Sequence, residues 1–319
     1  AHAYLFVGPA GVGKRLFARK ITQALFCHRH ADAELEACGT CSACKQVLTG
    51  THPDLLTVGV PEGKRELPVA AIMGDDDHRG RAGLIYDLSL RPMSAARRIA
   101  IIDDADRMNE EGANALLKTL EEPPPESILI LISPASDLLL PTIRSRCQPL
   151  LFGALAEQDV AELLVQLEWE RDPAAAAEIA RLSGGSLDTA RQLLEPGLRG
   201  LRETMATALA AHPFSPVETS ARVLKALEEL EGGTAVQRDG ASWLIRFAVD
   251  FLRQSLSPVV DVAGPVARFR RAHPPDDVAA ADRIVAALDR CLQSEDQLQQ
   301  SMPVPLCLES LLYDVGRIL

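Results

Sequence analysis

The sequence predicts an α/β domain built on a parallel sheet, followed by an all-helical remainder. Two nearly continuous apolar runs, at residues 98–102 and 128–132, are typical of parallel strands that are covered on both faces. A glycine-rich segment directly after a third apolar run, residues 4–7, indicates a strand, a tight loop and then a helix. After about residue 153 the strand patterns end and only helical periodicities follow.

Length and charge narrow the range of functions. The chain has 319 residues, enough for two or three domains. Its content of 47% hydrophobic and 24% charged residues is ordinary for a folded protein, and no run approaches the ~18 apolar residues of a membrane helix. A net charge of -11 argues against general attraction to DNA or anionic lipid. No secretory signal is visible, so we expect a cytoplasmic protein without membrane contact.

The elements of the α/β part follow in order. We expect strands at residues 4–7, 98–102 and 128–132. A helix should run from about residue 109 to 120, because the prolines at 123–125 cannot continue it. Residues 74–80 are rich in glycine and charge and should form an exposed loop.

The remainder reads as helices throughout. Helical periodicity marks residues 156–167, 173–182 and 186–194. Farther on, Trp243, Phe247 and Phe251 recur every four residues, which indicates the core stripe of a long helix. Prolines and a glycine predict a loop over residues 257–275 before a final pair of helices. The predicted domains are residues 1–152, 153–197 and 198–319.

The segment from Gly8 to Lys14 has the spacing of a phosphate-binding loop. Glycines at Gly8, Gly11 and Gly13 would let backbone N–H groups turn toward phosphate oxygens, and Lys14 would meet the terminal phosphates. Arg15 stands where such loops carry the Ser or Thr that holds Mg²⁺. The sequence leaves open whether ATP with Mg²⁺ binds here, and the alternative is a glycine-rich turn without a ligand.

Asp103 and Asp104 follow the second apolar run. In hydrolytic proteins of this architecture, an Asp that orients the metal is followed here by a Glu that activates water. Asp104 is one methylene shorter than that Glu, and a misplacement of ~1 Å can lower a rate by up to about 10²-fold. We therefore expect the chain's own ATP hydrolysis to be impaired or absent; the alternative is a solvated strand end.

Four cysteines within 18 residues form a candidate metal site. They are Cys27, Cys38, Cys41 and Cys44. Four thiolates are the ligand set of a closed, tetrahedral zinc site. Such a site has no open position for catalysis, so the expected role of zinc is to stabilise the folded state of this insertion. Free thiols or a redox pair are the alternatives. The nearby histidines, His28, His30 and His52, are left unassigned.

Arg146 stands in the segment LPTIRSRC, residues 140–147. By itself this triplet has little specificity, because an arginine at the surface is commonly an ion-pair partner. The other segments that occur with it are more informative. The chain resembles the bacterial DNA polymerase III clamp-loader subunits of the AAA+ class in the order and spacing of this segment and four others: HAYLFVGPAGVGK at 2–14, CGTCSAC at 38–44, THPDL at 51–55 and NALLKTLEEPP at 114–124.

The resemblance implies a RecA-like domain with a zinc insertion, a small helical lid, and a C-terminal helical collar that joins subunits into a five-membered arc. Such loaders, part of the DNA polymerase III holoenzyme, place a ring-shaped sliding clamp on primed DNA. Arg146 resembles the arginine finger that reaches into a neighbouring subunit's ATP site, where its permanent charge stabilises the γ-phosphoryl group. The implied partners are the tau/gamma and delta subunits, the sliding clamp and primer–template DNA.

Three departures from the motor subunits favour a non-hydrolysing member of the family. They are Arg15, Asp104 and Asp188, which stands where motor subunits carry a lid arginine. The alternative is an ATP-hydrolysing motor of the tau/gamma type that tolerates these residues. A DNA-binding module built on the cysteines is disfavoured, since no basic and aromatic patch surrounds them. Family members also carry a short segment before HAYLF that helps to frame the adenine pocket, and we expect it to be missing or trimmed.

Overall fold

The computed structural model describes residues 2–61, 64, 66–75, 77–78, 80–230, 232–257, 264–300 and 302–319. It divides into two compact units. The first comprises Ala1–Gln166 and Ser183–Thr189, and the second comprises Leu167–Leu182 and Ala190–Leu319. None of the helices in the described ranges is both long enough and apolar enough to cross a membrane. The three-domain division expected from the sequence stays a prediction.

A five-stranded, entirely parallel sheet forms the centre of the first unit. The strands are β1 (Ala3–Val7), β2 (Leu55–Val58), β3 (Arg98–Ile102), β4 (Ser127–Ser133) and β5 (Gln148–Leu151), in the spatial order β2-β3-β4-β1-β5. The three predicted strands are confirmed as β1, β3 and β4. The sequence pattern does not reveal β2 and β5, because each has only four residues and lies at an edge of the sheet.

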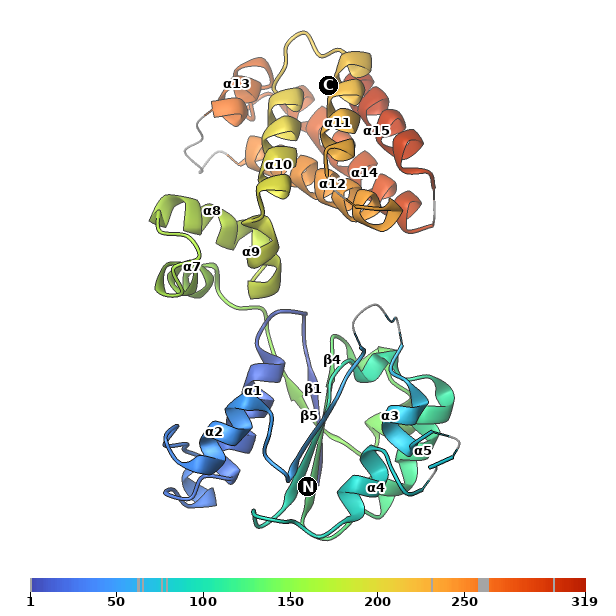
Figure 1. Cartoon of the computed structure of the whole chain (residues 1–319). Helices are drawn as coiled ribbons and strands as arrows, with labels where there is room; N and C mark the ends of the chain where they lie inside the picture. The colour runs from blue at the N-terminus through green and yellow to red at the C-terminus, as the bar shows by residue number, and fades with distance from the viewer. Residues whose placement is uncertain are drawn as a thin grey trace. The chain divides into compact units, whose positions relative to one another are not determined.

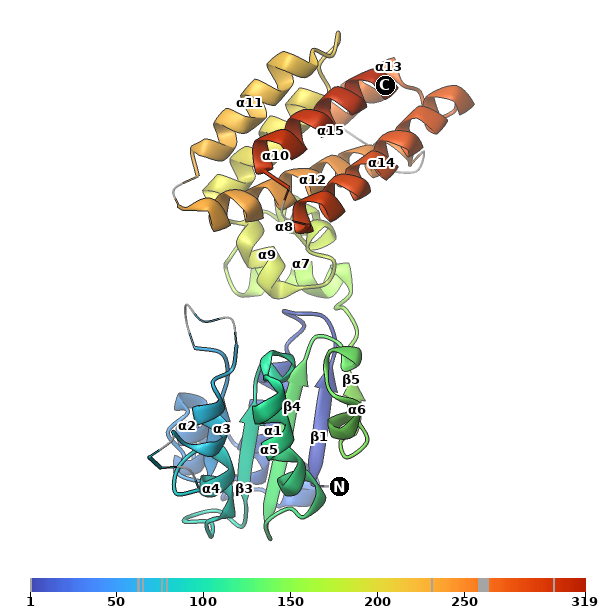
Figure 2. The ribbon, with the colours of Figure 1, turned by 90° about the vertical axis from the view of Figure 1, so that its right-hand side faces the viewer.

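Helices cover both faces of this sheet, as Figures 1 and 2 show. One face carries α1 (Lys14–Leu25) and α2 (Ser42–Thr49); the other carries α3 (Val69–Met73), α4 (Leu84–Ser89), α5 (Glu110–Glu121) and α6 (Pro141–Arg144). Strand β3 serves both layers, since Ile99 and Ile101 pack with the first pair and Ala100 and Ile102 with the second group. The expected burial of this strand on both faces is therefore confirmed. A seventh helix, α7 (Glu157–Gln166), ends the main segment of this unit.

A buried carboxylate ties the start of β2 to the loop before β3. The side chain of Asp54 is inaccessible to solvent, and Arg98 lies 3.7 Å from one of its oxygens. These oxygens also accept hydrogen bonds of 2.7 to 2.8 Å from the backbone N–H groups of Met93, Ser94 and Ala95. Burial by itself would raise the pKa of Asp54, but the backbone donors and Arg98 together hold it below its usual value.

Replacing Asp54 with asparagine should destabilise the first unit. The variant leaves Arg98 buried without its counter-charge, and breaking a buried pair costs about 3–5 kcal/mol. The charge contributes fully above the unfolded-state pKa of ~3.9 and its contribution is lost as the pH falls through the depressed folded value. Urea unfolding should therefore show a large difference from the unmodified chain at pH 7 and a smaller one near pH 3. The exposed Asp137→Asn is the control, and a difference independent of pH would contradict the role of the charge.

All regular secondary structure in the described part of the second unit is helical. Its helices are α8 (Pro173–Ser183), the end of α9 (Leu187–Leu193), α10 (Pro196–Leu209), α11 (Pro216–Glu228), α12 (Thr234–Leu256), α13 (Gly264–Ala272), α14 (Val278–Gln299) and α15 (Val304–Ile318). Helix α12 packs against α10 and α14, and α15 packs against α11 and α14 (Figure 2). Phe247 and Phe251 are buried on α12 and Trp243 is half-buried, which confirms the predicted core stripe.

The loop predicted over residues 257–275 is wrong for its middle part. Residues 264–272 form α13, and residues 258–263 lie outside the described residues. Pro265 is tolerated because it lies in the first turn of the helix, where a backbone N–H has no intrahelical partner. Val266 and Phe269 are buried on one face of this helix. In the predicted loop 74–80, residues 76 and 79 lie outside the described residues, and the others are turn or coil as expected.

Candidate functional site

The glycine-rich loop joins β1 to α1 in the predicted strand–loop–helix order. A Cβ atom on Gly8 would lie 2.2 Å from the carbonyl oxygen of Phe152, and one on Gly11 would lie 2.2 Å from the hydroxyl of Ser186. Gly11 also has a positive φ of +73°, and its carbonyl oxygen accepts a 3.0 Å hydrogen bond from the N–H of Leu187. The turn that precedes α9 is therefore packed directly on this loop.

Lys14 lies folded against the loop that precedes it. Its Nζ donates 2.6 Å hydrogen bonds to the carbonyl oxygens of both Gly8 and Pro9, and the residue is only 8% exposed. Burial lowers the pKa of Lys14. The carboxylates that oppose this shift are, in decreasing order, those of Asp103, Asp106, Asp188 and Asp104. Four carboxylates thus favour the charged form of the lysine that was expected to meet phosphate.

Arg15 forms an ion pair with Asp103, which stands where hydrolytic proteins of this architecture carry the Asp that orients the metal. The distance between Arg15 Nη1 and Asp103 Oδ2 is 3.4 Å. Burial and, next, the adjacent carboxylate of Asp104 raise the pKa of Asp103, although Arg15 and Lys14 oppose the rise. The residue that replaces the Mg²⁺-binding hydroxyl therefore places its positive charge beside the carboxylate that a metal would need.

Asp106 is a member of this cluster that the sequence pattern does not single out. The side chain is 8% exposed, and its Oδ1 has no hydrogen-bond partner among the described residues. A short 3₁₀ turn, Ala105–Arg107, follows Asp104 and brings the Asp106 carboxylate back toward Lys14. No regular spacing in the sequence could have singled it out, because Asp104, with a φ of +52°, separates Asp103 from the 3₁₀ turn that holds Asp106.

Arg146 lies at the end of the sheet where the strands begin, whereas the glycine-rich loop lies at the end where they finish. It precedes β5, which pairs in parallel with β1 so that Gln148 aligns with Tyr4 and Leu151 with Val7. Arg146 is therefore level with the start of β1, whereas the loop follows the end of that strand. Six residues at ~3.3 Å each separate the two levels, or roughly 20 Å. Arg146 cannot reach phosphate bound at its own loop.

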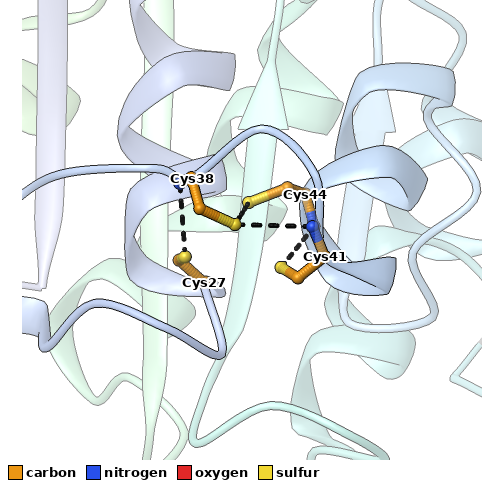
Figure 3. Close-up of side chains that lie close together, drawn as sticks. All are labelled: Cys27, Cys38, Cys41 and Cys44. Atoms are coloured by element: carbon orange, nitrogen blue, oxygen red, sulfur yellow. Dashed lines mark hydrogen bonds between the residues drawn. The ribbon is translucent and has the colours of Figure 1, made fainter.

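Four cysteine thiols converge between the end of α1 and the start of α2 (Figure 3). The sulfur atoms of Cys27, Cys38, Cys41 and Cys44 all lie within 4.8 Å of one another, and all four are free thiols. Cys27 follows α1, and Cys41 is the N-cap of α2, so two helices fix the ends of the cluster. The predicted ligand set is brought together completely.

The backbone around these sulfur atoms suits a bound cation. Cys27 Sγ accepts from the N–H of Cys38 at 3.4 Å, Cys38 Sγ accepts from Cys41 at 3.4 Å, and Cys41 Sγ accepts from Cys44 at 3.5 Å. Hydrogen bonds from Thr40 and from the Cys41 N–H lower the pKa of Cys38 to about 5, whereas burial raises that of Cys44 to about 12. N–H donors stabilise thiolates, which are the form that binds metal. The donor set therefore fits a metal ion held by four sulfurs.

The nearby histidines do not join this set. His52 is 3% exposed and stacks on Phe26 with ring centroids 4.4 Å apart, so it belongs to the core. His30 lies 2.9 Å from Glu34 at the surface, and this hydrogen bond raises the pKa of His30. Among the described residues, the ligand cluster that contains Cys27 includes cysteines alone.

Comparison with known proteins agrees with these features. The family model described as "DNA polymerase III, delta subunit" matches residues 1–156. The delta-prime subunit of DNA polymerase III from Pseudomonas aeruginosa is 36% identical over 228 residues, which cover 67% of this chain and 65% of that protein. By these matches the chain is similar to the delta-prime subunits of DNA polymerase III.

Matches to other relatives extend farther along the chain. A DNA polymerase III gamma/tau subunit from Mycobacterium tuberculosis is 30% identical over 281 residues, covering 84% of this chain and 46% of that protein. A solved gamma-subunit-related protein of Thermotoga maritima aligns with 99% of this chain and 94% of its own, at 18% identity and a TM-score of 0.43. The chain thus spans less than two thirds of the length of the delta-prime and gamma/tau relatives described.

The candidate site residues of this chain fall into three places. Lys14, Arg15 and Asp103 meet at the carboxyl edge of the sheet. The cysteine cluster lies between α1 and α2. Arg146 lies apart from both, at the end of the sheet where the strands begin. The first place has the composition of a nucleotide site, and one of its two cations, Arg15, is paired with Asp103 within the chain.

Proposed function

We propose that this chain is a non-hydrolysing subunit of a DNA polymerase III clamp loader that donates Arg146 to the ATP site of a neighbouring subunit. The observation that carries this proposal is the placement of Arg146 at the sheet edge opposite the chain's own glycine-rich loop. A guanidinium so placed serves phosphate only on another chain. Its permanent charge and planar fork suit it to stabilise charge on a transferring γ-phosphoryl group.

The arrangement around the chain's own loop supports the absence of hydrolysis. Arg15 supplies no hydroxyl for Mg²⁺ and pairs with Asp103 instead. Asp188, beside the loop, adds negative charge where a phosphate-sensing arginine would be useful. The carboxylates near Lys14 disfavour a nucleoside triphosphate electrostatically.

The proposed metal is a structural zinc ion held by the four cysteines. Four sulfur ligands complete a tetrahedral shell and leave no position for substrate, so zinc would stabilise the segment between α1 and α2. Val47 on α2 is buried in the apolar cluster between the helices and the sheet, which links the metal-binding segment to the α/β domain. The proposed role of zinc is therefore to complete folding of this insertion.

The proposed partners are the other subunits of the loader, tau/gamma and delta. The sliding clamp and primer–template DNA would be partners of the assembled complex. The net charge of -11 supports assigning DNA contact to the assembled complex, since an acidic chain by itself has little electrostatic attraction to DNA. The proposed process is loading of the clamp during DNA replication.

An ATP-hydrolysing motor of the gamma/tau type is the second candidate. The 30% identity to a gamma/tau subunit over 84% of this chain favours it. A motor would need the ion pair between Arg15 and Asp103 to open and a metal to bind without the usual hydroxyl ligand. Turnover by the chain's own site distinguishes the two candidates.

The isolated chain should not hydrolyse ATP above background, and Lys14→Ala should leave that background unchanged. We expect no turnover because Arg15 and Asp103 pair with each other at the place where Mg²⁺ would have to bind. Phosphate release by the purified chain with ATP and Mg²⁺ measures this directly. Arg15→Thr, which restores a hydroxyl, is the informative companion variant. Turnover by the unmodified chain that Lys14→Ala abolishes would favour the motor.

A further inference from the structure

We propose that Glu121 is the positioning residue for Arg146, and this inference rests on the proposed function of Arg146. Arg146 Nη2 donates a 2.5 Å hydrogen bond to Glu121 Oε1, and the two residues are 25 positions apart in sequence. The carboxylate holds the guanidinium in the orientation from which it meets a neighbouring subunit's ATP site.

The guanidinium of Arg146 is held from two sides. Its Nη1 donates to the carbonyl oxygen of Thr142 at 2.9 Å and to the hydroxyl of Ser145 at 3.3 Å. These acceptors belong to the same short segment as Arg146, so by themselves they restrain the side chain only locally. Glu121 adds an anchor on a different helix, which fixes the direction of the planar fork.

Both members of the pair are mounted on the rigid core. Ile143 and Cys147 flank Arg146, and Leu120 precedes Glu121. All three are buried in one apolar cluster beneath α5 and α6, with at most 7% of any of them exposed. Packing of these neighbours leaves the two charged side chains little freedom to drift apart.

The end of α5 explains why a carboxylate needs a cation here. Glu121 is the last residue of that helix, where backbone carbonyl groups concentrate negative potential. A negative side chain at this end is unfavourable unless a positive charge compensates it. Arg146 supplies the compensation, whereas the adjacent Glu122, which is also exposed, has no ion-pair partner within the part of the chain that is described.

The pair positions the arginine without sequestering it. The side chains of Arg146 and Glu121 are 34% and 50% exposed, so water reaches both of them. Exposed ion pairs are weak, and phosphoryl oxygens can therefore replace the carboxylate as acceptors. The conformational entropy of a long arginine side chain is lost before the neighbour's nucleotide arrives, which lowers the cost of reaching the transition state.

Steady-state ATP turnover of the reconstituted loader, with clamp and primed DNA, tests the inference. Glu121→Ala should lower kcat by up to about 5-fold at the site that receives Arg146, because an exposed ion pair is weak and can shift the population of the productive side-chain orientation by only about that factor. KM should change little, since the finger acts in the transition state. Glu121→Gln retains a neutral acceptor and should fall in between. Glu122→Ala removes the same charge from the next position and should leave turnover unchanged.

The double variant decides whether Glu121 acts through Arg146. Glu121→Ala combined with Arg146→Ala should be no slower than Arg146→Ala by itself, because the positioned group is already absent. A further loss in the double variant, unchanged turnover in Glu121→Ala, or faster turnover in Glu121→Ala would each overturn the inference. If Arg146→Ala itself has no effect, the proposed finger fails and this inference falls with it, whereas an effect of Arg146→Ala without one of Glu121→Ala removes the positioning role only. Circular dichroism and assembly of each variant check that the fold is preserved.

Discussion

Replacing Arg146 with alanine should strongly reduce ATP turnover by the reconstituted loader while the isolated chain stays folded. A finger of this kind contributes about 10³ to 10⁵-fold to turnover at the site that it enters. The loader should therefore lose at least that site's whole share of hydrolysis. The fold should persist because the Arg146 side chain is 34% exposed and its ion pair lies at the surface, where such pairs stabilise by at most ~1 kcal/mol.

The measurement is clamp- and DNA-stimulated turnover with assembly checked on the same samples. Arg144→Ala is the matched control, because Arg144 is an exposed arginine two positions away at the end of α6. Loss of turnover confined to Arg146→Ala would establish that this chain completes a neighbour's site. Full turnover in that variant, with normal assembly, would rule out the finger and leave the chain a scaffold of the loader.

Removing one cysteine of the cluster should release the metal and unfold the segment between α1 and α2. The unmodified chain should contain one zinc ion, and Cys38→Ser should contain none. Binding of structural zinc contributes about 10–16 kcal/mol in small zinc-binding peptides, so this local loss should be large even though α2 also packs on the core. Elemental analysis measures the metal, and amide hydrogen exchange in α2 measures the folding of the segment.

Cys38 is preferred for this test because it is only partly buried, so its replacement disturbs packing less than that of the buried Cys44. Cys291→Ser, which changes a buried thiol in the second unit, is the control and should keep its zinc. Treatment of the unmodified chain with a chelator should reproduce the exchange pattern of Cys38→Ser. A metal-free chain whose α2 amides remain fully protected would contradict a folding role for zinc.

Much of the α/β unit was predictable from local patterns. The apolar runs at β3 and β4 identify buried parallel strands because no polar residue interrupts them. Helix α5 was predictable from Asn109, whose side chain accepts the N–H of Gly112 at 3.0 Å, and from the prolines after its end. The edge strands and α13 were not, because edge strands need no continuous apolar run and Pro265 obscures the start of a helix that tolerates it.

The sequence by itself determined the chemical inventory of this protein. It showed the four sulfur ligands, the loop glycines, and the replacement of a metal-binding hydroxyl by Arg15, since each of these features lies within one short segment. Only the tertiary structure decided which charges meet. The ion pair of Arg15 with Asp103 and that of Arg146 with Glu121 join residues that are far apart in sequence. Their contact depends on strand order and register, which parallel crossovers set over the whole sheet and no local pattern encodes.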